Sequence, residues 1–106
     1  MTGEERLQKL KEMEAQKPND VFLKYAIALE YVGIGNDENA KEIFEALLEL
    51  SPDYIATYYQ LGKLYERDNA NEKALAIYRR GVELAENNND KKNSRELNEA
   101  IMLLED

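Results

Sequence analysis

Tyrosine offers the most binding chemistry in this sequence, and three of its seven copies fall within the stretch YYQLGKLY, Tyr58 to Tyr65. A tyrosine joins a rigid aromatic ring to a hydroxyl, and such residues often contribute strongly to binding at protein interfaces. The stretch also contains Gly62, although glycine costs a helix about 1 kcal/mol relative to alanine. The rings therefore serve either packing around a close helix contact or recognition of a partner.

Residue patterns that support catalysis or metal binding are missing. The sequence has no histidine and no cysteine, which removes the commonest general base, the commonest metal ligand, thiolate sites and disulfides. It has no phosphate-binding loop and no nucleophile elbow, and the polar run 87–93 lacks the ligand spacing of a calcium loop. We therefore expect no enzymatic activity, no metal and no cofactor.

Composition and charge favour a small helical protein. The chain has 106 residues, 43% of them hydrophobic, and a formal net charge of −8; we expect one domain over residues 1–106. The negative charge argues against nucleic acids and anionic membrane surfaces as partners. The sequence has no apolar run of roughly 18 residues and no signal-peptide core, so we expect a cytoplasmic protein.

A repeat of 34 residues organises the chain. Identical residues at this offset include Pro18 and Pro52, Tyr25 and Tyr59, Tyr31 and Tyr65, Ala40 and Ala74, and Ile43 and Ile77. Each unit is predicted to hold two helices, at about 20–32 and 38–50 in the first and about 53–67 and 72–86 in the second. The turn 33–36 has two glycines suited to a left-handed backbone. Asp37 is predicted to cap the next helix, and Pro52 to end it.

The order of large and small residues resembles the tetratricopeptide repeat family, whose helix-turn-helix follows W-x2-L-G-x2-Y, then A-x3-F, then P. The second unit reads Tyr58-x2-Leu61-Gly62-x2-Tyr65, then Ala74-x3-Tyr78; the first reads Ile27-Ala28-x2-Tyr31, then Ala40-x3-Phe44 and Pro52. Lys24 and Glu86 depart from the pattern, at its first aromatic and its final proline. The resemblance implies an all-α fold of antiparallel helix-turn-helix repeats, a short α-solenoid of about six helices.

Small residues such as Gly62 and Ala74 are predicted to mark a close approach of two helices, because larger side chains would push the axes apart. The aromatic residues of the pattern would then fill the space between helices. We expect five of them in the core: Tyr31, Phe44, Tyr58, Tyr65 and Tyr78.

The flanking segments are predicted to cover the ends of the two repeats, which span 19–52 and 53–86. Thr2-Gly3-Glu4-Glu5 is a capping-box pattern, so an N-terminal helix is expected at 3–16. Residues 87–93 are predicted to form a linker, and a C-terminal capping helix is expected at 90–105, begun by Asp90 or Asn93. The apolar stripes of these end helices are Leu7, Leu10 and Met13, and Leu97, Ala100, Ile101 and Leu104.

The resemblance also implies a concave groove lined by the first helix of each repeat. The corresponding positions are Phe22, Tyr25, Leu29 and Val32 in the first unit, and Ala56, Tyr59, Lys63 and Glu66 in the second. Tyr25 and Tyr59 lie outside the packing pattern and are therefore the leading candidates for partner contact. The alternative is that these rings only cover helix backbone or contact the C-terminal helix. The Lys and Asn clamp by which some family members bind chaperone tails is not present.

The leading functional hypothesis is a non-catalytic protein–protein interaction module, an adaptor or assembly factor that holds a peptide or helix of a partner protein in the groove. The alternative is a structural protein that self-associates through its terminal helices, and the chain is expected to be a monomer or a weak homodimer. The second helices are strongly acidic, with Glu42, Glu45, Glu49 and Glu72. This charge either keeps the protein in solution or steers a basic partner.

Overall fold

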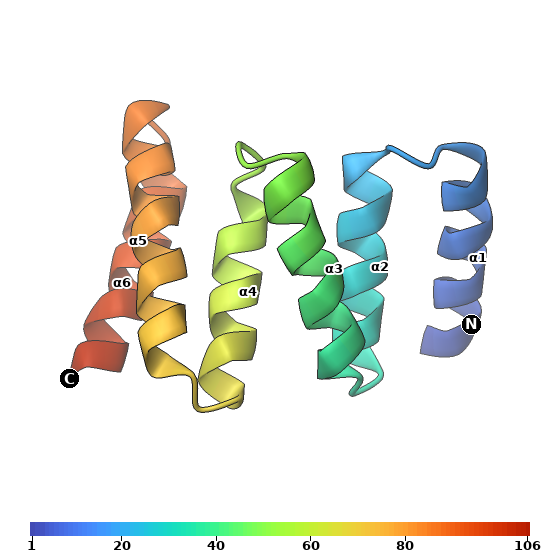
Figure 1. Cartoon of the computed structure of the whole chain (residues 1–106), viewed down its shortest axis with the longest axis horizontal. Helices are drawn as coiled ribbons and strands as arrows, with labels where there is room; N and C mark the ends of the chain where they lie inside the picture. Colours follow the sequence, from blue (N-terminus) through green and yellow to red (C-terminus); the bar gives the residue numbers. More distant parts are fainter. The chain divides into compact units, whose positions relative to one another are not determined.

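The computed structural model describes all residues from 1 to 106 and contains six α-helices and no strand (Figure 1). The helices are α1 (Gly3–Gln16), α2 (Val21–Gly33), α3 (Asp37–Leu50), α4 (Ala56–Arg67), α5 (Asn71–Asn87) and α6 (Lys91–Glu105). The predicted fold class, all-α with helix-turn-helix repeats, is confirmed. No helix is both long and apolar enough to cross a lipid bilayer.

The chain divides into two compact units, Met1–Pro52 and Asp53–Asp106. In the first unit α2 packs against both α1 and α3, and in the second α5 packs against both α4 and α6. Within each unit, short connections make successive helices antiparallel (Figure 1). The expected single domain over residues 1–106 stays a prediction.

Three turns between helices share one hydrogen-bond pattern. The backbone N–H groups of Asn36, Ala70 and Asp90 donate, each over 2.8 Å, to the carbonyl oxygens of Tyr31, Tyr65 and Ala85. The residue before each donor has a positive φ, 82° at Gly35, 59° at Asn69 and 56° at Asn89. This is a Schellman helix end, where glycine or asparagine accepts the left-handed conformation. The turns inside the two repeats and the turn before α6 therefore use the same chemistry.

Helix starts differ from the predictions at two places. Asn36, rather than Asp37, caps α3, because its side chain accepts a hydrogen bond from the backbone N–H of Asn39 over 3.2 Å. The helix predicted to begin at Asp53 begins at Ala56, because Pro52 and Asp53 stay in the preceding turn. Helix α3 therefore starts one residue earlier than predicted, and α4 starts three residues later.

The linker predicted at 87–93 is shorter than expected and spans only residues 88–90. No proline stands at position 86 to end α5, which therefore continues to Asn87, and α6 begins at Lys91. Asp90 caps α6, as predicted, by accepting from the backbone N–H of Asn93 over 3.1 Å. Its other carboxylate oxygen accepts from the Asn93 side-chain amide over 2.7 Å, and these bonds lower the pKa of Asp90.

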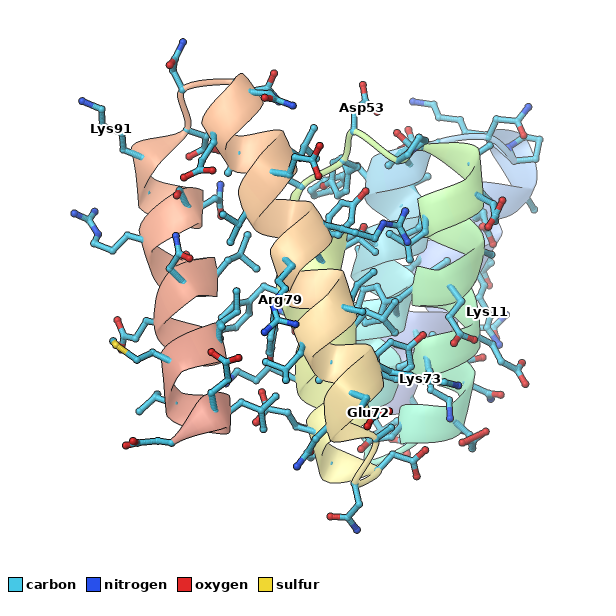
Figure 2. All side chains as sticks on the ribbon, turned by 60° about the vertical axis from the view of Figure 1, so that its left-hand side comes forward. Lys11, Asp53, Glu72, Lys73, Arg79 and Lys91 are labelled. Carbon is cyan, nitrogen blue, oxygen red and sulfur yellow. The ribbon has the colours of Figure 1, made fainter.

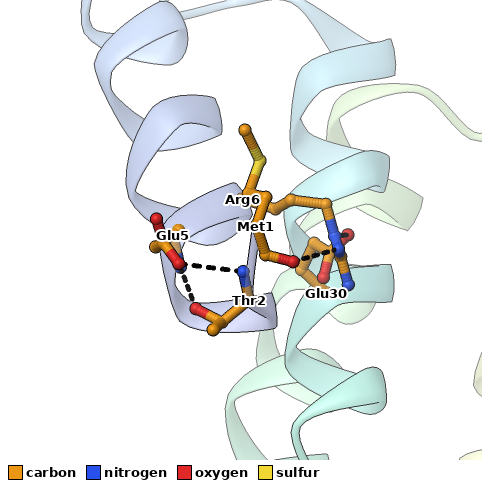
Figure 3. A network of polar contacts seen from close by, with 5 residues as sticks. All are labelled: Met1, Thr2, Glu5, Arg6 and Glu30. Atoms are coloured by element: carbon orange, nitrogen blue, oxygen red, sulfur yellow. Dashed lines mark hydrogen bonds and ion pairs between the residues drawn. The ribbon is translucent and has the colours of Figure 1, made fainter.

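The N-terminal helix begins with the expected capping box. The Glu5 N–H donates to the Thr2 hydroxyl over 3.1 Å, and the Thr2 N–H donates to the Glu5 carboxylate over 3.0 Å (Figure 3). Hydrogen bonding to Thr2, first through its backbone N–H, lowers the pKa of the Glu5 carboxyl. Arg6 then ties α1 to α2, with Nε 2.9 Å from the Glu30 carboxylate. The guanidinium also donates to the Met1 carbonyl over 3.2 Å.

The core of the first unit lies where α2 meets its two neighbours. Its buried residues are Leu7 of α1, Leu23, Ile27 and Ala28 of α2, and Ala40, Phe44 and Leu47 of α3. Lys24, at the aromatic position of the repeat pattern, is half-buried, and its Nζ lies 2.8 Å from the Glu14 carboxylate of α1. A lysine suits this position because α1 supplies the opposite charge. Met13, expected in the apolar stripe of α1, is instead 53% exposed.

The core of the second unit depends on two glycines. A Cβ added at Gly62 of α4 would lie 2.1 Å from Cε1 of Tyr78, so the ring from α5 rests on the α4 backbone. A Cβ at Gly81 of α5 would lie 2.8 Å from Tyr58 Cβ and 2.9 Å from Leu97 Cδ1. Gly81 therefore brings α5 close to both α4 and α6, and glycine is required at both contacts because neither leaves room for a methyl group.

Three side-chain contacts lie at the edges of the cores. Arg79, on the side of α5 that faces α6, places its guanidinium 2.6 Å from the Glu105 carboxylate (Figure 2). Tyr31 and Tyr65, expected in the core, are only half-buried. Their rings accept lysine ammonium groups, Lys11 at 5.2 Å and Lys73 at 5.7 Å from the ring centroids.

Candidate functional site

The predicted site residues lie along one face of the first helix of each repeat. On α2 this face carries Phe22, Tyr25, Leu29 and Val32, which recur at helical spacing. Phe22 is 65% exposed and Leu29 37% exposed, whereas Tyr25 and Val32 are half-buried. The equivalent positions on α4, Ala56, Tyr59, Lys63 and Glu66, are all half-buried. Each predicted set therefore shares a helix face within its own unit, and its role in binding stays a prediction.

The expectation that Tyr25 and Tyr59 lie outside the packing is wrong. The Tyr25 ring packs on Phe44 of α3, with centroids 5.7 Å apart, and the Tyr59 ring packs on Tyr78 of α5, with centroids 6.3 Å apart. The two rings are tilted by 59° and 45° to their neighbours. Both tyrosines are thus held by the second helix of their own hairpin and keep a partly exposed surface.

Three predicted site residues of α4 meet around Tyr78, which the sequence placed only in the core. The Tyr78 hydroxyl donates a hydrogen bond to the Glu66 carboxylate. The Lys63 Nζ lies 3.6 Å from that carboxylate and 5.2 Å from the centroid of the Tyr59 ring. Because Tyr78 is fully buried, it fixes the positions of Glu66 and, through it, Lys63 on the surface.

A cleft of about 460 Å³ lies between α4 and α6. Tyr59, Gln60 and Lys63 of α4 form one wall, and Glu96, Glu99, Ala100 and Leu103 of α6 form the other. Sequence reasoning found Tyr59 and Lys63 but missed the α6 wall. The signal was present, since Glu96, Glu99 and Leu103 share a helix face beside the apolar stripe of α6. Nothing in the local sequence, however, says that this face meets α4.

A second hollow, of about 700 Å³, lies between α1 and the start of α2. Its apolar side chains are Met13, Phe22 and Leu23. Two lysines and two acidic residues surround them, Lys9, Lys17, Glu12 and Asp20. In neither unit does any group of three or more potential ligand side chains lie close enough together to hold a metal ion.

Comparison with known families explains the repeated hairpin. The sequence model of the tetratricopeptide repeat family matches residues 23–54 and 55–88, which make up more than half of the chain. The chain belongs to the tetratricopeptide repeat family. Tetratricopeptide repeats generally mediate protein–protein interactions.

Solved structures of other tetratricopeptide repeat proteins resemble this chain. A crystal structure of a tetratricopeptide repeat domain protein from Salinibacter ruber is 41% identical, with a TM-score of 0.78, over 81% of this chain and 96% of that one. A solution structure of such a domain protein from the same organism is 41% identical, with a TM-score of 0.79, over 83% and 89%. A Bordetella parapertussis protein shares only the fold, with 21% identity, a TM-score of 0.81 and coverage of 92% and 85%. A search of curated proteins finds no match.

Tyr78 of this tetratricopeptide repeat chain is expected to ionise only at a pH well above the usual range of a tyrosine. Burial raises its pKa, and the hydrogen bond and negative charge of Glu66 raise it further. The folded state therefore keeps this proton at pH values where the unfolded tyrosine, with a pKa of about 10, has lost it. The contribution to stability is complete below pH of about 10 and decreases as the pH rises above that value.

An ultraviolet absorbance titration of tyrosinate measures this directly. The last ionisation step should coincide with alkaline unfolding, and it should disappear in Tyr78→Phe. The denaturant-unfolded protein is the control, in which all tyrosines should titrate together. A late step of undiminished size in Tyr78→Phe would assign it to another tyrosine.

Proposed function

We propose that this chain is a non-catalytic protein-binding module that acts as an adaptor or assembly factor. It binds a peptide or helix of a partner protein on the faces of its first helices. The contacting residues are Phe22, Tyr25, Leu29 and Val32 on α2, and Tyr59, Lys63 and Glu66 on α4. The observation that carries this proposal is the exposed apolar surface of α2, where Phe22 is 65% exposed and Leu29 is 37% exposed.

The chemistry of these faces supports binding. Tyr25 and Tyr59 present rings that are already held in place by Phe44 and Tyr78, so little side-chain freedom is lost when a partner binds. Lys63 and Glu66 add one charge of each sign, positioned by Tyr78. An apolar surface with a few fixed polar groups suits a short helix or an extended segment.

Peptide selection from a random display library tests the proposal. We expect the wild type to enrich peptides that bind Phe22→Ala/Leu29→Ala or Tyr59→Ala more weakly, by about 1 kcal/mol or more, because truncation removes buried contact surface. Circular dichroism and the thermal midpoint must first show that each variant folds. The Phe22 and Leu29 substitutions are the easier ones to interpret, because both side chains are exposed and their truncation should leave the core unchanged.

The matched control is Leu50→Ala, which removes an apolar side chain that is 48% exposed and lies outside the proposed faces. It should bind the enriched peptides like the wild type. Equal loss in the control and in the α2 variant would mean nonspecific hydrophobic capture. Unchanged binding in both the α2 and the Tyr59 variants would place recognition on another surface and overturn the proposed site.

One observation favours self-association as a second function. Met102 and Leu103 of α6 are 65% and 66% exposed, and adjacent exposed apolar residues on an end helix can pair between chains. Sedimentation equilibrium over a wide concentration range separates the two proposals. A mass that rises with concentration, and that no longer rises in Met102→Ser/Leu103→Ser, would support a weak homodimer.

A further inference from the structure

The cleft between α4 and α6 carries two acidic side chains. Glu96 and Glu99 lie one turn apart on its α6 wall, and neither forms an ion pair. Lys63 is the single basic residue in the lining. It is already engaged, 3.6 Å from the Glu66 carboxylate and over the Tyr59 ring. The cleft therefore has negative charge to offer a ligand.

The rest of the lining is apolar or neutral. Leu103, four residues after Glu99, is 66% exposed, and Ala100 and the Tyr59 ring lie beside it. Gln60 adds an amide from α4. A long basic side chain matches this combination, because its aliphatic stem can lie on apolar surface while its charged head reaches the carboxylates.

We propose that this cleft binds a segment of a partner protein through an arginine or lysine side chain of that segment. The inference rests on the proposed function and adds the chemical class of the partner. Two carboxylates three residues apart suit the planar guanidinium of arginine, which donates several hydrogen bonds in fixed directions. The chain's net charge of −8 attracts the same class of partner at longer range.

The hollow between α1 and α2 does not share this preference. Its two lysines balance its glutamate and aspartate, so it carries no excess of either sign. An acidic segment would meet uncompensated like charge in the α4–α6 cleft, which disfavours it. Of these two hollows, only the α4–α6 cleft therefore has an excess of negative charge in its lining.

Two synthetic peptides test the assignment, both acetylated and amidated at their ends. One contains two arginines among leucines and serines, and the other replaces both arginines with citrulline, which has the same shape and no charge. Each is titrated into the full ¹⁵N-labelled chain and followed by amide chemical shifts. We expect at least about tenfold tighter binding of the arginine peptide, with shifts concentrated on α4 and α6. The difference should shrink when salt is raised, because mobile ions screen the pairing.

Glu96→Gln/Glu99→Gln should abolish the preference for arginine. Glu83→Gln/Glu86→Gln is the matched control, because it changes the charge equally, at the same spacing, on exposed positions of α5. Equal affinity for both peptides, no binding of either, or equal loss in both variants would each overturn the inference. The outcome for the proposed function is decided by a different experiment, the library selection. The proposed function would stand if library selection still enriched Phe22- and Leu29-dependent peptides that lack basic residues.

Discussion

Replacing Phe44 with alanine is expected to lower the free energy of unfolding by about 3–5 kcal/mol, the usual cost of deleting a fully buried aromatic ring. Phe44 has no exposed surface and contacts the Tyr25 ring. The cavity would lie where α3 packs against α2, and relaxation could fill only part of it. Since small proteins are stable by about 5–15 kcal/mol, the loss is a large share of the total. Urea unfolding followed by circular dichroism measures it.

Leu50→Ala on the same helix is the control for this prediction. Leu50 is 48% exposed, so its truncation should change the free energy of unfolding by about 0.5 kcal/mol or less. Phe44→Leu should recover much of the loss, because it keeps most of the buried apolar volume. A change below about 1 kcal/mol for Phe44→Ala would show that α3 contributes little to the folding transition that is measured.

Phe44→Ala also has an expected effect on the proposed site. Tyr25 would lose the ring against which it packs, and its side chain would gain freedom that binding must then remove. Peptides that depend on the α2 face should therefore bind more weakly to Phe44→Ala than to Phe44→Leu at temperatures where both are folded. This comparison separates a positioning effect on Tyr25 from a loss of stability.

Gly62→Ala is expected to destabilise the second unit by about 2 kcal/mol or more, although alanine is the better helix former by about 1 kcal/mol. The new methyl group would lie 2.1 Å from Cε1 of Tyr78 and 2.6 Å from two further ring atoms. Tyr78 is fully buried, so the ring can move only by displacing α5 from α4. Overpacking of this kind typically costs about 1–3 kcal/mol, occasionally more. Thermal unfolding by calorimetry is the measurement.

Gly33→Ala provides the opposite result in the same protein. A Cβ at Gly33 would meet nothing within 4 Å, so alanine there should leave stability unchanged or raise it by up to about 1 kcal/mol. Gly62→Ala should also weaken the hydrogen bond from Tyr78 to Glu66, which makes the late tyrosine ionisation occur at lower pH. If Gly62→Ala were as stable as Gly33→Ala, the close approach of α4 and α5 at this position would be wrong.

Short-range patterns in the sequence were enough to predict the six helices and several of their ends. The capping box at Thr2 and the cap at Asp90 depend on residues three positions away. The left-handed turn at Gly35 is possible because glycine has no side chain. Where the prediction failed, tertiary packing decided. Met13 carries an apolar side chain at helical spacing but is exposed, and Tyr31 and Tyr65 are half-buried beside lysines.

For the candidate site, the sequence could predict only which residues share a face of the same helix. Spacing along one helix placed Phe22 with Leu29, and Tyr59 with Lys63, because residues three, four and seven apart share a face. Spacing could not show that Tyr25 packs against Phe44 and Tyr59 against Tyr78. Nor could it show that the Tyr78 hydroxyl donates a hydrogen bond to Glu66. Those contacts join residues from different helices, and their distances depend on how closely the helices pack.

The sequence by itself determined the family and the hairpin of each repeat, because the 34-residue period and its small residues encode helix lengths, turns and one close contact per hairpin. Only the tertiary structure decided that α6 forms the second wall of a cleft with α4. Gly81 lets Leu97 approach α5 closely, and this contact sets which face of α6 turns toward α4. Glu96 and Glu99 line the cleft only through that packing, since a carboxylate on an isolated helix face carries no information about what lies opposite it.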